Sequence, residues 1–121
     1  MSFTKQNLGR WGEQRAANFL QAKGYELIDT NVRTEYGEID IIARSGRELV
    51  FVEVKTRSSD TFGHPEEAIT EAKQQHMIDS AEAYLQSSAQ DDALWRIDVI
   101  AIQRNSGDDT PEILHIENAL G

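Results

Sequence analysis

The sequence predicts an α/β fold: a single mixed β-sheet flanked by helices, in the order αβββαβ, with a short strand at the end. Three observations lead to this class. Apolar residues recur at helical spacing in two segments, three stretches rich in β-formers follow the first segment, and a further strand follows the second. A strand that comes after a helix is what a parallel crossover requires. One sheet with helices on its faces accommodates all of these elements.

The first element is a helix, predicted over residues 6–23. Gly24 comes directly after Lys23 and is typical of the position at which a helix stops. The apolar residues that recur at helical spacing are Leu8, Trp11, Ala16, Phe19 and Leu20.

Three strands follow this helix, at residues 25–32, 38–44 and 49–56. Each stretch is rich in β-branched and aromatic residues, and each is bounded by polar or turn-forming residues. The Ser45-Gly46 pair between the second and third stretches is typical of a hairpin turn. We therefore expect these two strands to be antiparallel neighbours.

The second half predicts a helix and two more strands. Pro65 suits a first helical turn and Thr70 is an alternative N-cap, while the helix ends near residues 86–88. Strands are expected at residues 94–103 and 113–116, with a turn-rich loop between them. The helix places one face of apolar residues together: Met77, Ile78, Ala81, Tyr84 and Leu85.

Composition predicts one domain spanning residues 1–121. The chain has 121 residues, of which 39% are hydrophobic and 27% charged, enough for one core. No apolar run approaches the ~20 residues that span a bilayer, and the first residues lack the apolar stretch of a signal peptide. The absence of cysteine excludes disulfides, thiol nucleophiles and cysteine zinc sites. We expect a cytoplasmic protein with no membrane partner.

Charge is distributed unevenly. Residues 1–60 hold nine Lys and Arg against nine Asp and Glu, and residues 61–121 hold three against twelve, so the net charge of −9 belongs to the second half. A nucleic-acid-binding protein is expected to present a basic surface. The first half would therefore have to contact any polyanion, and a basic partner protein would suit the second half.

Charged residues interrupt two of the predicted strands. Strand alternation places Glu53 and Lys55 on the same face as Phe51, opposite three valines, and places Asp40 with Glu38 and Ile42, opposite Ile39 and Ile41. Across the predicted hairpin, Asp40 and Glu53 can lie close together. Paired carboxylates are ligands for a hard cation such as Mg²⁺, and a neighbouring lysine can orient water or offset charge on a phosphate. These residue types suit metal-dependent phosphodiester hydrolysis.

Two motifs carry a resemblance to a known family. Asp40, followed by Glu53-Val54-Lys55, resembles the D…(E)XK signature of the PD-(D/E)XK, restriction-endonuclease-like nucleases. A wider set of motifs is similar to the YraN-like family of bacterial proteins, which is regarded as resembling Holliday-junction resolvases. That set is Gly9-x-x-Gly12-Glu13, Asn31-x-Arg33, Gly37-Glu38-Ile39-Asp40-Ile41-Ile42, Phe51-Val52-Glu53-Val54-Lys55-Thr56-Arg57, Arg96-Ile97-Asp98-Val99 and Glu117-Asn118-Ala119-Leu120.

The resemblance implies an endonuclease that hydrolyses DNA, branched DNA included, with one or two Mg²⁺ or Mn²⁺ ions. By position, Asp40 and Glu53 would be metal ligands and Lys55 the catalytic lysine, and Glu13 would add a helix carboxylate to the metal site. Lys73 matches a basic residue at the start of the second helix. Resolvase-like proteins act as homodimers, so a dimer is expected as well.

Other interpretations of these residues stay open. Asp40, Glu53 and Lys55 could form a structural ion-pair cluster, and Glu13 could be a solvated residue that pairs with Arg10. The protein could then be a non-catalytic interaction or assembly module that keeps the nuclease fold. Arg33 and Arg57 are candidates for phosphate contacts.

Five further residues are predicted to lie outside the metal site or are left open. Glu38 is expected to be an exposed residue next to a turn. Asp98 either supports the site or points to solvent. His64, His76 and His115 are not spaced as a metal motif and are expected in loops or on the surface.

Overall fold

The computed structural model describes residues 4–58, 69–90, 92–104 and 110–120. It is an α/β structure in which two helices flank a single mixed sheet of five strands, consistent with a restriction-endonuclease-like core. The predicted fold class is confirmed. Its elements are α1 (Lys5–Ala22), β1 (Glu26–Thr34), β2 (Gly37–Ser45), β3 (Glu48–Ser58), α2 (Glu71–Ser87), β4 (Leu94–Arg104) and β5 (Glu112–Ile116).

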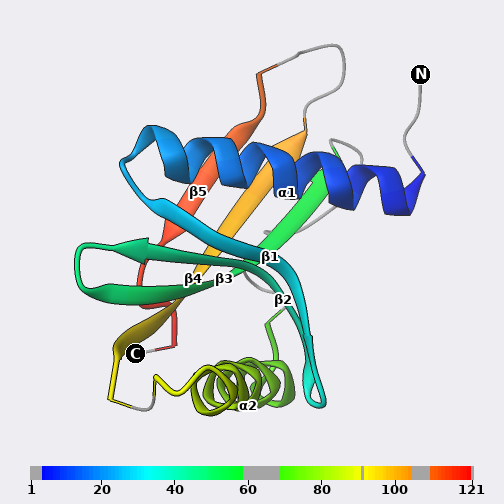
Figure 1. Cartoon of the computed structure of the whole chain (residues 1–121). Helices are drawn as coiled ribbons and strands as arrows, with labels where there is room; N and C mark the ends of the chain where they lie inside the picture. Colours follow the sequence, from blue (N-terminus) through cyan, green and yellow to red (C-terminus); the bar gives the residue numbers. More distant parts are fainter. Residues whose placement is uncertain (1–3, 59–68, 91, 105–109, 121) are drawn as a thin grey trace.

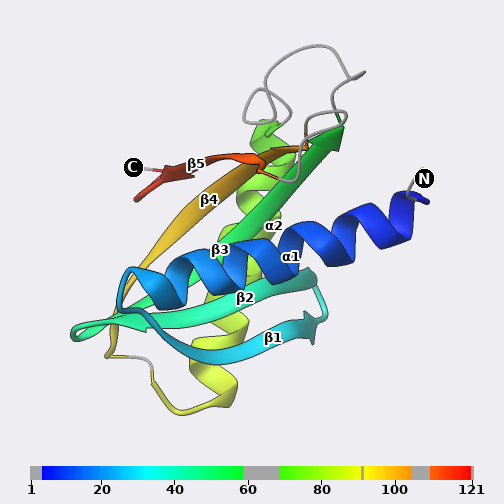
Figure 2. The same ribbon diagram turned by 90° about the horizontal axis from the view of Figure 1, so that it is seen from above.

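The strands lie side by side in chain order, β1-β2-β3-β4-β5. Neighbours are antiparallel except β3 and β4, which are parallel and are joined through α2. Figure 1 shows α1 on one face of the sheet and α2 on the other, and Figure 2 shows α1 crossing the strands with α2 behind them. Each helix therefore covers its own face of the sheet.

Both helices begin at a threonine whose hydroxyl caps the first turn. Thr4 Oγ1 accepts the Asn7 amide at 3.1 Å, and Thr70 Oγ1 accepts the Lys73 amide at the same distance. Thr70 is thus the start of the second helix. The alternative start at Pro65 lies outside the described residues, as does His64.

The core forms two layers, one under each helix. Alternation along β3 directs Val50 and Val52 toward α1 and Phe51 toward α2, as predicted. The predicted alternation in β2 is wrong at one point, because Ile39 packs in the α2 layer with Ile42, whereas Ile41 packs in the α1 layer. The alternation therefore breaks at Asp40, between Ile39 and Ile41.

No helix in the described parts of the chain combines the length and the apolar character needed to cross a bilayer.

Candidate metal centre

The hairpin of β2 and β3 places Asp40 beside Glu53, as the sequence predicts. The register pairs Ile41 with Val52, the chain neighbours of Asp40 and Glu53, and the charge of Glu53 raises the pKa of Asp40. The backbone ladder ends there, and Asp40 Oδ2 instead accepts the Val54 amide at 2.8 Å. A side-chain oxygen therefore satisfies a donor of β3 at the point where β2 departs from the ladder.

Three carboxylates converge at this point, and we call Glu13, Glu38 and Asp40 the acidic cluster. One oxygen from each lies within 4.8 Å of the others. Glu13 comes from α1, and Glu38 and Asp40 come from β2. The predicted neighbours Glu13 and Asp40 are thus brought together. Glu38 is exposed, as expected from the sequence, yet its carboxylate belongs to the cluster.

Asn31, to which the sequence assigned no role, joins two members of the acidic cluster. Its side-chain amide donates to Glu13 Oε1 at 2.9 Å and to Glu38 Oε1 at 3.2 Å. The backbone of Asn31 has a φ of 51°, a left-handed conformation that is uncommon within a strand and that asparagine tolerates. The available signal was its place in the Asn31-x-Arg33 motif. Glu13 has no ion pair with Arg10 within the described chain, contrary to the alternative interpretation.

The electrostatics of Asp40 follow from burial and from like charge. Burial, followed by the charges of Glu53, Glu13 and Glu38, raises the pKa of Asp40 from 3.8 to about 7, and the Val54 hydrogen bond acts against this rise. Such an environment disfavours the ionised form of Asp40 unless a cation is present. Carboxylate oxygens are the ligands that hard divalent cations take.

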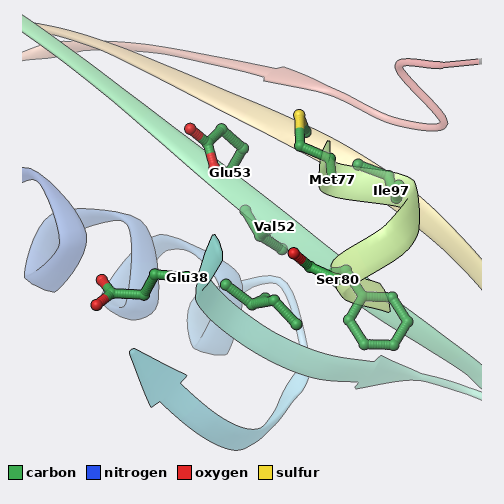
Figure 3. Close-up of a pocket in the computed structure, with 8 residues that line it drawn as sticks. Glu38, Val52, Glu53, Met77, Ser80 and Ile97 are labelled. Carbon is green, nitrogen blue, oxygen red and sulfur yellow. The ribbon is translucent and has the colours of Figure 1, made fainter. Parts of the chain in front are cut away.

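Glu53 contacts cations rather than the acidic cluster's shared centre. Glu53 is 8% exposed, and its Oε1 lies 3.1 Å from Lys73 Nζ and 3.7 Å from Lys55 Nζ. Lys73 extends from α2, and Lys55 lies two residues along β3 on the same face. Figure 3 shows the Glu53 and Glu38 carboxylates at one end of a pocket whose other side is formed by Met77, Ser80 and Ile97.

Gly12 allows α1 to approach β3 closely. A Cβ built on Gly12 would lie 1.9 Å from Thr56 Oγ1, whereas one on Gly9 would meet nothing within 4 Å. Because Glu13 follows Gly12, this close approach brings the helix carboxylate over the hairpin. Of the two glycines in the Gly9-x-x-Gly12 motif, only the second has a steric reason in the described structure.

The two arginines predicted to contact phosphate have different surroundings. Arg33 is exposed, and its guanidinium lies 3.7 Å from Glu38. Arg57 is half-buried near the end of β3 and has no ion pair or hydrogen bond within the described part of the chain. Both lie on strands that carry members of the site or adjoin it, and their contact with phosphate stays a prediction.

Asp98 and His115 form a second polar network that lies outside the site. Asp98 is fully buried and accepts hydrogen bonds from Arg96 and from the Asn118 amide, with His115 Nε2 at 2.8 Å. The alternative that Asp98 points to solvent is therefore wrong, and a supporting role for it stays a prediction. The expectation that His115 lies in a loop or on the surface is also wrong, because it is on β5 with its side chain 4% exposed. His76 is exposed, as expected.

The fold and the site define an α/β protein with an acidic cluster between its first helix and its central hairpin. More particularly, the chain belongs to the uncharacterised protein family UPF0102, which matches residues 12–102. All the residues of the acidic cluster lie in the matched region. This membership confirms the predicted resemblance to the YraN-like family.

Similar proteins span nearly the same length. The UPF0102 protein of Syntrophotalea carbinolica is 43% identical over 99% of this chain and 96% of its own length. The UPF0102 protein of Caldicellulosiruptor saccharolyticus is 44% identical, with 96% of this chain and 98% of the relative covered. A third, from Chlorobium phaeobacteroides, is 50% identical over 84% of this chain and 81% of its own.

Proposed function

We propose that this protein is a divalent-metal-dependent endonuclease that hydrolyses phosphodiester bonds in DNA. The observation that carries the proposal is the convergence of Glu13, Glu38 and Asp40 beside the Glu53–Lys55 pair. The resemblance of Asp40 and Glu53-Val54-Lys55 to the nuclease signature supports the same reaction. Branched DNA is the substrate that the resemblance to resolvases favours.

The residues present fit a hard divalent cation. Asp40, Glu13 and Glu38 offer oxygen ligands from two elements, and the raised pKa of Asp40 follows from its burial and from the neighbouring carboxylates. Glu53, predicted as a ligand, stands beside this set. A bound Mg²⁺ or Mn²⁺ would supply Lewis-acid polarisation of the phosphate and offset the charge of the carboxylates.

The chain's own residues have distinct roles in this proposal. Lys55, held 3.7 Å from Glu53, positions the attacking water and offers a positive charge to the phosphate. Asn31 holds the Glu13 and Glu38 carboxylates in place through its two hydrogen bonds. Arg57 and Lys73 supply further positive charge for the DNA backbone.

The test combines metal binding with cleavage. Mg²⁺ and Mn²⁺ are titrated calorimetrically into the wild type, Asp40→Asn, Glu53→Gln and a control, Glu35→Gln, which changes an exposed turn residue outside the acidic cluster. Cleavage of linear and four-way DNA is followed in the same variants and in Lys55→Met. We expect Asp40→Asn to lose binding and cleavage, Lys55→Met to lose cleavage alone, and the control to keep both. Cleavage that survives Asp40→Asn would contradict the proposal.

One observation favours a second function, a non-catalytic assembly module. Lys55 and Lys73 already neutralise Glu53, and the second half of the chain carries the whole net charge of −9. A basic protein partner would suit that half. DNA binding that weakens steeply with salt supports the nuclease, because phosphate contacts release counterions. Absence of DNA binding at low salt, with and without metal, supports the module.

The resemblance to resolvases also leads us to propose a homodimer located in the cytoplasm. Two subunits would allow two strands of a branched substrate to be cut. Light scattering across a dilution series, with and without branched DNA, tests the oligomeric state. A monomer under all these conditions would contradict it.

A further inference from the structure

We propose that the groove between α1 and β1 binds the sugar–phosphate backbone of the DNA strand next to the acidic cluster. This inference rests on the proposed function and adds where the substrate strand lies. The groove has a volume of about 270 Å³. Figure 2 shows α1 lying along the sheet beside β1 and β2, the elements that form the groove's sides and floor.

The groove is continuous with the candidate metal centre, because two residues belong to both. Glu13 is a member of the acidic cluster, and Asn31 is hydrogen-bonded to two of its members. Both also line the groove. A strand lying in the groove therefore has one end at the carboxylates, where its neighbouring phosphate would meet the metal.

Arg10 gives the groove a positive charge that no carboxylate among the described residues pairs with. Arg10 lines the groove, is exposed, and has no ion pair or hydrogen bond with any residue that the structure describes. Six other basic residues of the described chain differ from Arg10, whereas Arg57 on β3 likewise has no ion pair there. Cations with a carboxylate within 4.0 Å are Lys23, Arg33, Arg44, Lys55, Lys73 and Arg96.

The remaining lining suits a sugar and a phosphate. Gln14 donates one amide hydrogen to Asn18 Oδ1 at 3.0 Å and has a second that can be donated to a phosphate oxygen, and Thr30 adds a hydroxyl. Ala17 forms an apolar part of the floor, backed by the fully buried Ile41, and can pack against deoxyribose carbons. An arginine with neutral hydrogen-bonding groups is the usual composition of a backbone contact.

The adjoining carboxylates make binding depend on a divalent cation. Without one, Glu13, Glu38 and Asp40 would repel a phosphate that approaches from the groove. Ca²⁺ satisfies oxygen ligands and is the cation for the binding test, so that binding can be followed under conditions in which cleavage is measured separately with Mg²⁺.

The experiment uses the full chain labelled with ¹⁵N and a short DNA duplex with a single-stranded overhang. In Ca²⁺ we expect the duplex to shift the side-chain amide signals of Gln14 and Asn31. Arg10→Ala should weaken binding about tenfold near 0.1 M salt and lower the salt slope by about one. The control, Arg47→Ala, removes an equal charge from the β2–β3 turn and should change both far less.

The outcomes separate this inference from the proposed function. If Arg10→Ala binds DNA with the wild-type affinity and salt slope, the groove assignment is overturned, and cleavage in Mg²⁺ by the wild type would leave the nuclease intact. If the groove signals shift and Arg10→Ala weakens binding while Mg²⁺ supports no cleavage, hydrolysis fails and the groove stands. If thymidine 5′-monophosphate shifts the same signals as strongly as the duplex, the groove binds a free nucleotide. That result would overturn the proposal that a DNA strand lies in it.

Discussion

Two aspartates lie within the same sheet, and their surroundings differ in kind. Asp98 on β4 is fully buried, and every partner of its carboxylate is a donor: Arg96 Nε at 2.9 Å, Arg96 Nη2 at 3.3 Å and the Asn118 amide at 3.0 Å, with His115 Nε2 at 2.8 Å. In return, hydrogen bonding to Asp98 raises the pKa of Arg96. This network contains the charge that balances Asp98.

Asp40 on β2 is the contrasting case. It accepts one backbone hydrogen bond, from Val54, and otherwise faces carboxylates. A buried charge with its own donors holds the fold together, whereas a half-buried charge among like charges needs a cation from outside. The comparison therefore assigns a structural role to Asp98, and it supports the proposed metal-binding role of Asp40.

The largest effect is expected at the structural aspartate. Asp98→Ala leaves Arg96, which is mostly buried, and His115 without their acceptor, so we expect the free energy of unfolding to fall by about 3–5 kcal/mol. Urea denaturation followed by circular dichroism measures the change. Glu117→Gln is the matched control, because Glu117 is exposed and lies 3.9 Å from Lys23 at the edge of the same network. That variant should change stability by less than ~1 kcal/mol. Equal effects in the two variants would contradict the comparison.

Substitution of Asp40 is expected to have the opposite effect, because it should raise the free energy of unfolding at high pH. Its pKa is about 7 in the folded protein and 3.8 in the reference state, so the stability it contributes is fully present below the lower value and is lost as the pH rises through the higher one. In the presence of a chelator, Asp40→Asn should therefore be more stable than the wild type near about pH 8, by roughly 1–4 kcal/mol, and close to it near about pH 4. Denaturation at both pH values measures the difference. A difference in stability that does not vary with pH would show that the ionisation of Asp40 does not destabilise the folded protein.

Gly9 and Gly12 of α1 test how the packing of α1 against β3 brings Glu13 to the acidic cluster. In Gly12→Ala the new methyl group would lie 1.9 Å from Thr56 Oγ1, so α1 must move away from β3, at a cost of about 1–3 kcal/mol. Gly9→Ala meets open space and should stabilise the helix by about 0.5–1 kcal/mol. Chemical denaturation of both variants gives the two values. Equal changes would contradict the close approach of α1 to β3.

Much of the fold could be predicted from periodicity, because apolar spacing distinguishes helices from strands and Ser45-Gly46 indicates the hairpin. The Asp40–Glu53 proximity follows from that hairpin, since antiparallel pairing needs only the turn position. Strict alternation failed at Ile39, because the backbone ladder stops at Asp40, where a side chain accepts the Val54 amide. Periodicity does not predict that a side-chain oxygen takes the place of a backbone acceptor.

Two features of the sites required three-dimensional information. Asn31 holds Glu13 and Glu38 from a left-handed backbone position, and a local sequence pattern does not show which residues such a turn of the chain brings into reach. The Asp98–His115 contact depends on the β4–β5 register, which pairs Ile100 with His115. The position of the last strand was predicted, but its register was not.

The smallest expected effect concerns Lys73, which pairs with Glu53. Its amine is 3.1 Å from Glu53, and its side chain is 39% exposed, so Lys73→Gln should change stability by less than ~1 kcal/mol. The same substitution removes a positive charge beside the carboxylates and should raise Mg²⁺ affinity several-fold at low salt, by about 1 kcal/mol of Coulomb energy. Lys23→Gln is the matched control, since Lys23 is equally exposed and pairs with Glu117 instead. Calorimetry on both variants measures the effect. An unchanged Mg²⁺ affinity in Lys73→Gln would give Glu53 and its two lysines a structural role, like that of Asp98. The metal centre would then consist of the acidic cluster alone.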